Sequence, residues 1–399
     1  MRHLVLLALA LLLAATQVTL PAGAAGFVVN STGDGADLSI DGVCDAGGGA
    51  CTLRAAIQEA NSTPTVDTIG FSVASGLQTI RPASPLPEIT QPVTIDGRTQ
   101  PGYSGKPIIE IDGTNAGSNP SNYAYGFWIA GGTSTIRGLI INNFPGEAIV
   151  LIGDQAGNNV IAGNYIGTDA TGTQAMGNAY GVWIFGSTAN VIGGTTPDAR
   201  NVISGNFGAG LLLWDLVGPE GNVIEGNYIG SDYTGTDDVG NTRGVELHNG
   251  GTEPGYLIGG SARGAGNLIS GNYETGIYLF GAKNNVIEGN LVGTNLTGAA
   301  PLGNGGDGIF LLGEADNNLI GGSTAGARNV ISGNAGNGIF ISNTSFNGNQ
   351  IIGNYIGSGI TGLLPLGNAQ DGIHVGGPTG DGWYSQIGGT SAGEGNLIA

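Results

Sequence analysis

Short apolar runs separated by glycine and asparagine repeat along most of the chain. The run NVIEGNYIG begins at Asn222, and close variants of it begin at Asn159, Asn285 and Asn349. The second asparagine of each copy lies at Asn164, Asn227, Asn290 and Asn354. Successive copies are therefore 63 (227−164), 63 (290−227) and 64 (354−290) residues apart. A long fixed period of this kind is typical of a stacked repeat protein, or solenoid.

A second pattern divides each 63-residue unit into two coils of about 31 or 32 residues. It consists of a glycine, an aliphatic residue, any residue and another aliphatic residue, and its first aliphatic position falls at Val182, Leu211, Val245, Ile277, Ile309, Ile339 and Ile373. Each coil holds three apolar runs of four to six residues, which are too short for helices and fit strands between turns. The pattern predicts an all-β fold, a single-stranded right-handed parallel β-helix solenoid, with regular repeats over residues 126-399.

Alternation within the run NVIEGN separates core positions from surface positions, because side chains alternate across a strand. The third residue is isoleucine in every copy, at Ile161, Ile224, Ile287 and Ile351, whereas the fourth varies. We expect the isoleucines to point inward and the asparagines that follow to stack at one corner of the coil. The intervening coils are expected to continue this ladder through Asn206, Asn272 and Asn334. Their recurrence indicates a structural role for these amides.

Residues 1-24 have the features of a secretory signal peptide. Arg2 and His3 precede an apolar stretch at residues 4-15, and Ala22, Gly23 and Ala24 supply a small-residue cleavage site. A membrane anchor is the alternative, but the apolar stretch is short for a membrane span. The chain is therefore expected to be secreted, extracellular or on the cell surface, with no transmembrane segment in the mature form.

Residues 25-65 are expected to form an N-terminal cap. An exported protein meets an oxidising compartment, so we expect a disulfide between the two cysteines, Cys44 and Cys51. A metal site is the poorer alternative, because no histidine lies nearby to complete a ligand set. Thr52 can cap a short helix whose apolar face consists of Leu53, Ala56, Ile57 and Ala60. This helix would cover the open end of the core, and the proline-rich residues 66-125 would form irregular first coils.

The same segment is similar to a known family. The sequence CTLRAAIQEAN, from Cys51, resembles the CSLREA-type motif that precedes β-helix repeats in bacterial surface and secreted proteins of the pectate-lyase-like superfamily. Thr52 and Ala55 stand where that motif has serine and glutamate. The resemblance covers about thirty residues and implies an extracytoplasmic right-handed β-helix. It transfers no catalytic residue, because membership carries no agreed activity.

The charge balance narrows the choice of partners. The chain has 11 Lys and Arg residues against 30 Asp and Glu residues, a formal net charge of −19. Such a surface repels phosphate backbones, so nucleic acid is not an expected partner. The 79 glycines fit the tight turns that join the strands of a solenoid.

The most informative irregularity lies in the strand that contains the glycine–aliphatic pattern. If its aliphatic residues face inward, the residue between them faces outward, and this column reads Trp128, Val150, Trp183, Leu212, Glu246, Tyr278, Phe310, Phe340 and His374. A second outward column includes Phe185, Trp214, His248, Phe280 and Leu312. Trp128, Trp183, Trp214, Tyr278, Phe280, Phe310 and Phe340 are therefore candidate ligand-binding residues for a polysaccharide or a cell-surface ligand. Two alternatives are a covering segment and a register error that places these rings inside.

One coil interrupts this aromatic column with polar residues. The candidates for catalysis are Asp237, Asp238, Arg243, Glu246 and His248. Glu246 and His248 are two residues apart on a strand and share a face, where carboxylates could act as acid and base on a glycosidic bond or hold Ca²⁺ for a lyase. A solvated turn with an ion pair is the alternative that the sequence favours. The Asn-Thr-Asp, His-Gly and Arg-x-Lys motifs of β-helix polygalacturonases do not occur in this column.

Few residues indicate a metal. Asp169 and Asp232 occupy matching positions in long loops and are candidates for Ca²⁺, but Asn295 and Gly359 replace them in later copies. Periplasmic copper-handling proteins share the expected fold, yet two methionines and three histidines argue against copper. No other cofactor is expected.

The chain stops partway through a repeat, at residues 396-399, so we expect further coils, a cap or an anchor after them, or another molecule on the last coil. The pattern as a whole favours adhesion or polysaccharide binding without catalysis. A polysaccharide lyase or glycoside hydrolase on the outer face and a purely architectural stalk are the alternatives.

Overall fold

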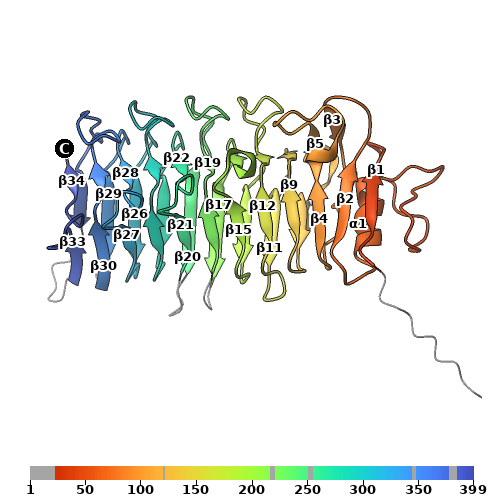
Figure 1. Cartoon of the computed structure of the whole chain (residues 1–399), viewed down its shortest axis with the longest axis horizontal. Coiled ribbons are helices and arrows are strands. Elements are labelled where there is room, and N and C mark those ends of the chain that lie inside the picture. Colours follow the sequence, from red (N-terminus) through yellow and green to blue (C-terminus); the bar gives the residue numbers. More distant parts are fainter. Residues whose placement is uncertain (1–22, 120–121, 216–220, 250–254, 344–346, 377–383) are drawn as a thin grey trace, which may run out of the picture.

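The computed structural model describes residues 23–119, 122–215, 221–249, 255–343, 347–376 and 384–399. Three parallel sheets run the length of an elongated molecule, from β1 at one end to β34 at the other (Figure 1). Each regular coil contributes one strand to every sheet, and the coils stack along the long axis. This is a parallel β-helix, so the fold class predicted from the sequence is confirmed. The proposed signal peptide lies almost wholly outside the described residues.

The sheets differ in how early they begin. In spatial order, sheet A consists of β1 (Gly26–Val29), β2 (Asp67–Phe71), β4 (Val93–Asp96), β9 (Thr135–Arg137), β12 (Val160–Ala162), β15 (Val191–Gly193), β18 (Val223–Glu225), β21 (Leu257–Gly259), β24 (Val286–Glu288), β27 (Leu319–Gly321), β30 (Asn347–Ile352) and β33 (Tyr384–Ile387). Sheet B consists of β3 (Gln78–Ile80), β5 (Ile109–Asp112), β10 (Ile140–Asn142), β13 (Tyr165–Ile166), β16 (Val202–Ile203), β19 (Tyr228–Ile229), β22 (Leu268–Ile269), β25 (Leu291–Val292), β28 (Val330–Ile331), β31 (Tyr355–Ile356) and β34 (Leu397–Ile398).

Sheet C begins later and consists of β8 (Phe127–Ile129), β11 (Ile149–Ile152), β14 (Val182–Phe185), β17 (Ala209–Asp215), β20 (Arg243–Asn249), β23 (Ile277–Phe280), β26 (Ile309–Gly313), β29 (Ile339–Asn343) and β32 (Ile373–Gly376). The first coils, over residues 66-125, therefore add strands to sheets A and B, and they reach sheet C through an isolated parallel bridge between Ile89 and Ile129. A small antiparallel hairpin pairs β6 (Ser118–Asn119) with β7 (Asn122–Tyr123). Three short 3₁₀ turns lie at η1 (Gly97–Thr99), η2 (Gly113–Asn115) and η3 (Pro197–Ala199).

The core is a set of aliphatic stacks that follow the predicted alternation. Ile161, Ile224, Ile287 and Ile351 are all 0% exposed, and parallel pairing connects them through the isoleucines of the coils between. Fully burying one such side chain contributes about 1.5–3 kcal/mol. Because this gain is repeated in each coil, the stacked isoleucines form a continuous hydrophobic core along the solenoid.

Asparagines form three hydrogen-bonded ladders inside the corners. The ladder between sheets A and B runs without a break through Asn164, Asn201, Asn227, Asn267, Asn290, Asn329, Asn354 and Asn396. Each Nδ2 donates to the Oδ1 of the next asparagine and to a backbone carbonyl of the preceding coil, as Asn227 does with Asn267 at 3.1 Å and Ile192 at 2.8 Å. The buried amides thus satisfy one another's hydrogen bonds in place of water, and they hold neighbouring coils in register.

The predicted continuation of this ladder is wrong. Asn206, Asn272 and Asn334 belong to a separate ladder between sheets B and C, where they alternate with Asn178, Asn241, Asn304 and Asn368. The two families of asparagine occur in similar sequence contexts, but one follows the sheet A strand and the other follows the sheet B strand. A third ladder leads into sheet A through Asn159, Asn190 and Asn222 and, further along, through Asn285, Asn318 and Asn349.

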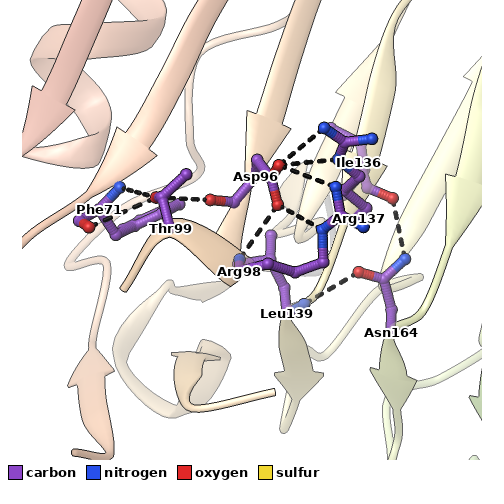
Figure 2. Close-up of polar contacts among 8 residues, drawn as sticks. All are labelled: Phe71, Asp96, Arg98, Thr99, Ile136, Arg137, Leu139 and Asn164. Atoms are coloured by element: carbon purple, nitrogen blue, oxygen red, sulfur yellow. Dashed lines mark hydrogen bonds and ion pairs between the residues drawn. The ribbon is translucent and has the colours of Figure 1, made fainter. Parts of the chain in front are cut away.

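Charged side chains hold the early coils together where the A–B ladder begins (Figure 2). Asp96 accepts from Arg98 Nε on its own coil at 2.9 Å and from Arg137 Nε on the next coil at 2.9 Å. Burial alone would raise the pKa of Asp96, but the two guanidinium groups outweigh it and hold this pKa below the ordinary value. Asn164 lies beside this group, donating to the Ile136 carbonyl at 2.9 Å.

The N-terminal end is covered as the sequence predicts. Helix α1 (Leu53–Ala60) packs on β1 and β2, and its predicted apolar face is buried. Thr52 caps it by accepting a hydrogen bond from the Ala55 amide at 3.1 Å. The predicted disulfide joins Cys44 and Cys51, whose Cα atoms are 5.1 Å apart.

We expect Asn227→Leu to destabilise the solenoid strongly. The change removes the acceptor of Asn201 Nδ2 and the donor to Ile192 and Asn267, and each buried polar group left unpaired costs about 1–3 kcal/mol. Thermal unfolding should show a clearly lower Tm for this variant. Asn115→Leu, at an exposed position, is the control and should leave Tm nearly unchanged. Equal Tm values for the two variants would contradict a structural role for the ladder.

Candidate functional site

One row of side chains follows the outer surface of sheet C, with one residue from each strand. Consecutive members are register partners, in the order Trp128, Val150, Trp183, Leu212, Glu246, Tyr278, Phe310, Phe340 and His374. The residues on either side of Trp183 in its strand, Val182 and Ile184, are 0% exposed, so the row faces outward. This pairing rules out the alternative that a register error places the rings inside.

A second outward row lies beside the first. It contains Phe185, Trp214, His248 and Phe280, of which Trp214 and Phe280 are 41% and 48% exposed. Rings touch along and between the rows: the Phe310 and Phe340 centroids are 4.8 Å apart and nearly parallel, and those of Trp214 and His248 are 5.1 Å apart. We call these two rows the aromatic band. It runs across nine strands, or roughly 38 Å at about 4.8 Å per strand, although Val150 and Leu212 of the first row are themselves buried.

A third outward row was missed by the sequence reasoning. It lies three residues before the first row and includes Tyr125, Glu147, Tyr180, Arg243 and Asp371. Three of its members contact the first row directly, in the pairs Tyr125–Trp128, Arg243–Glu246 and Asp371–His374. Strict alternation would turn this position inward.

The third row breaks the alternation because of the glycine that follows it in most coils. This glycine faces the core, as does the aliphatic residue after it. A Cβ on Gly181 would lie 2.7 Å from Ile203 Cγ2, and one on Gly244 would lie 2.7 Å from Ile269 Cγ2. The chain therefore makes a corner at this glycine, and the residue before it points outward. The glycine that begins each glycine–aliphatic pattern is the feature of the sequence that could have indicated this corner.

Glu147 has an unusual place in the third row. Backbone hydrogen bonds from Gly126 to Glu147 and from Ala148 to Tyr180 put its coil between those of Tyr125 and Tyr180. Within the described residues its half-buried carboxyl group has no ion pair. Burial raises its pKa, and a hydrogen bond from its own backbone amide opposes this rise in part. It is therefore a carboxyl group flanked by rings, with no cation to neutralise it.

The structure brings together three of the five residues proposed for catalysis. Glu246 Oε2 accepts from Arg243 Nη1 at 2.9 Å, and its Oε1 lies 2.8 Å from His248 Nε2. Arg243 also binds Glu274 at 3.0 Å and lies over the Tyr278 ring, while His248 stacks on Trp214. Both carboxylate oxygens of Glu246 are therefore occupied, one by Arg243 and one by His248.

The electrostatics of Glu246 follow from these contacts. Burial would raise its pKa, but the hydrogen bond from His248 and the positive charge of Arg243 outweigh burial and lower this pKa below the ordinary value. Glu246 is accordingly ionised and held in place at neutral pH. A general acid needs the opposite, a carboxyl group that keeps its proton near the working pH.

Asp237 and Asp238 do not join this group. They are exposed in the loop between β19 and β20, and in the described residues their carboxylates have no hydrogen bond or ion pair with Arg243, Glu246 or His248. The backbone explains the separation, because Asn241 of the B–C ladder lies between the loop and the strand. Proximity in sequence placed them in the same candidate site.

The two calcium candidates, Asp169 and Asp232, accept hydrogen bonds from within their own loops and stabilise the loop conformation. One oxygen of Asp232 accepts from the backbone amides of Thr236 and Asp237 at 3.0 and 3.1 Å, and both oxygens accept from the Thr234 hydroxyl. Asp169 makes the matching bonds in its loop. Asn295 makes them through its Oδ1 in the next copy, so this loop structure does not require a carboxylate or a bound cation.

Part of the chain matches a known family model. Residues 195–374 match the model described as periplasmic copper-binding protein (NosD). The match covers 180 residues (374−195+1) of 399. This segment is similar to a parallel β-helix family, in agreement with the fold. The model does not extend to the CSLREA-like segment, which stays a prediction.

The described residues do not fit a copper centre. The matched segment contains two histidines, His248 and His374, on strands β20 and β32 of sheet C. These strands are four positions apart, or roughly 19 Å at about 4.8 Å per strand. Both cysteines are in the disulfide, and within the described residues no three His, Cys, Asp or Glu side chains are grouped to hold a metal. Copper prefers such nitrogen and sulfur ligands, so the family description does not carry over through these side chains.

Several solved structures resemble the chain at low sequence identity. The A-module of mannuronan C-5 epimerase AlgE6 from Azotobacter vinelandii is 13% identical, with 94% of this chain and 99% of that chain covered and a TM-score of 0.44. The periplasmic alginate epimerase AlgG is 14% identical, with coverages of 79% and 77% and a TM-score of 0.41. The catalytic domain of a GH87 alpha-1,3-glucanase in complex with nigerose is 12% identical, with coverages of 86% and 67% and a TM-score of 0.35. At these values the resemblance carries no argument about function.

No curated protein matches the chain significantly. In the part of the chain that the structure describes, no helix has the length and hydrophobicity to cross a membrane.

The ion pairs of Glu246 predict a specific acid sensitivity. Because the folded-state pKa of Glu246 lies below the ordinary 4.5, its ionisation contributes stability that is present above about pH 4.5 and is lost as the pH falls toward the folded-state pKa. Hydrogen bonds to a charged group contribute about 1.5–3 kcal/mol, so Glu246→Gln should have a lower Tm than the native protein at pH 7.

The difference in Tm between Glu246→Gln and the native protein should then shrink at about pH 3. Glu314→Gln is the control, since Glu314 pairs with Lys283 but is 68% exposed and such exposed pairs contribute little. A difference in Tm for Glu246→Gln that is independent of pH would contradict this assignment.

Proposed function

We propose that this β-helix is an exported or cell-surface protein that binds polysaccharide on the outer face of sheet C, without catalysis. The observation that carries the proposal is the aromatic band. From Trp214 to His374 its rings touch from coil to coil, and rings such as Trp214 and Phe280 remain exposed. Monomeric proteins rarely leave contiguous apolar patches of this extent uncovered without a ligand or partner. Sugar rings have apolar faces that pack on aromatic rings, and a long polymer suits a long flat face.

The rigidity of the band supports binding. Each ring belongs to a strand that is hydrogen-bonded on both sides within sheet C, except at its ends, and the asparagine ladders hold the coils behind it. A preorganised surface has less conformational entropy to lose on association, which favours affinity. The cluster of Glu246, Arg243 and His248 places hydrogen-bonding groups in the middle of the band, where sugar hydroxyls would need partners.

A lyase or hydrolase on the same face is the second candidate function, and one observation favours it. Glu147 has a carboxyl group with a raised pKa and no ion pair within the described residues, in a row with aromatic rings, as a general acid would require. Hydrolysis of a glycosidic bond ordinarily uses two carboxyl groups that flank the bond. The neighbours of Glu147 in its row are tyrosines, and Glu246 is ion-paired with Arg243 and hydrogen-bonded to His248, so the pair is incomplete.

Binding should be measurable with the purified mature chain and a panel of neutral and acidic polysaccharides. We expect retention on at least one polymer, and Trp183→Ala and Trp214→Ala should each weaken it roughly tenfold, the equivalent of about 1.4 kcal/mol. Tyr273→Ala, which removes an exposed ring (68%) outside the band, is the matched control and should retain native binding. Unchanged retention in both tryptophan variants would contradict binding by the band.

The same incubations test for catalysis. We expect no release of reducing or unsaturated ends from any polymer that the protein retains. Release that is lost in Glu147→Gln or Glu246→Gln would replace the binding proposal with the enzyme. If no polymer of the panel is retained and none is cleaved, an architectural role is the interpretation that stands.

A further inference from the structure

A groove runs along the coil axis at the corner between sheets B and C. Its volume is about 750 Å³, and its lining comes from four successive coils, at residues 113–117, 143–145, 177–180 and 207–208. The coils stack about 4.8 Å apart, so the groove follows three spacings, or roughly 14 Å. Ligand sites are usually concave, and the aromatic band by itself is a flat face.

The groove adjoins the aromatic band through Tyr180. This tyrosine lines the groove and also belongs to the outward row three residues before Trp183. Its ring lies against Gly208 of the next coil, where an added Cβ would be 2.5 Å from Tyr180 Cε1. Phe207 stands beside that glycine with 77% of its surface exposed. Two aromatic side chains therefore line the last two of the four coils that form the groove.

The lining is uncharged, with more apolar than polar surface. Thr114, Asn115 and Asn143 supply hydroxyl and amide groups, and none of the described lining residues is charged. One charged pair beside the lining is neutralised, because Asp112 accepts from Arg81 Nε at 2.9 Å; Asp112 also accepts from Asn143 Nδ2 at 3.1 Å. Glu147, the neighbour of Tyr180 in the third row, adds a carboxyl group with no ion-paired cation among the described residues. An anionic sugar would find no free cation here, and the net charge of −19 would repel it.

We propose that this groove is the principal subsite for a segment of a neutral polysaccharide, lying along the coil axis, with Tyr180 and Phe207 packing on sugar faces. Asn115 donates to and accepts from the sugar hydroxyls. The Thr114 hydroxyl and the Asn143 amide already donate to Asp112 and Asn142, so these two residues accept from the sugar hydroxyls through their oxygens. The proposal rests on polysaccharide binding by the outer face and adds the place and the charge class of the ligand. The aromatic band then receives the continuation of the same chain beyond Tyr180.

The test compares neutral and acidic oligosaccharides of equal length on the purified full chain. The probes are cellohexaose, mannohexaose and hexagalacturonate, measured by titration calorimetry at about 0.15 M salt. We expect a neutral hexasaccharide to bind and Phe207→Ala and Tyr180→Ala each to weaken it roughly tenfold. Tyr273→Ala is the matched control: Tyr273 follows Asn272 of the B–C ladder as Phe207 follows Asn206, and it lies outside the groove. Circular dichroism and Tm confirm that each variant is folded.

The outcomes separate this proposal from the one it rests on. Binding of hexagalacturonate in preference to both neutral probes overturns the neutral class. Neutral binding that is weakened by Trp214→Ala but unaffected by Phe207→Ala and Tyr180→Ala overturns the groove while leaving the aromatic band as the binding face. Equal losses in Phe207→Ala and Tyr273→Ala also overturn the groove. Failure of the native protein to bind any probe or any polymer of the panel overturns both proposals.

Discussion

The hydrogen-bonded asparagine ladders are the constraint on which the rest of the molecule depends. Each rung saturates an amide that is buried between coils, as Asn227 does with Asn201, Asn267 and Ile192. Buried polar groups are costly unless they are paired, so a coil displaced by one residue would lose its rungs as well as its isoleucine stack. The ladders thereby fix the register in which the outer side chains of sheet C meet.

The fixed register explains how an irregular set of side chains becomes a continuous surface. Trp183, Tyr278 and Phe310 are far apart in sequence, yet each falls at the same position of a coil and lies in one row. The same rule puts Arg243, Glu246 and His248 in contact and puts Tyr180 between the groove and the aromatic band. The repeated core residues form the scaffold, and the outer positions that vary between repeats carry the aromatic and charged side chains.

The sequence predicts the fold and the two outward rows well because both depend on short-range alternation within a repeat. It does not predict the third row, with Tyr125, Glu147 and Tyr180, since the corner at glycine breaks that alternation. The assignment of Asn206 to the wrong ladder has a related cause: two corners share the sequence pattern of a short aliphatic run followed by Gly-Asn. The separation of Asp237 from Glu246, and the groove itself, depend on the path of the loops and corners, which no local pattern encodes.

A crystal structure of the full chain with a neutral hexasaccharide is the most direct test that the outer face of sheet C is a carbohydrate-binding surface. We expect sugar rings stacked on Tyr180 and Phe207 and extending toward Trp183, with the coils unchanged. Sugar bound at the sheet A or sheet B faces, with the aromatic band empty, would contradict it.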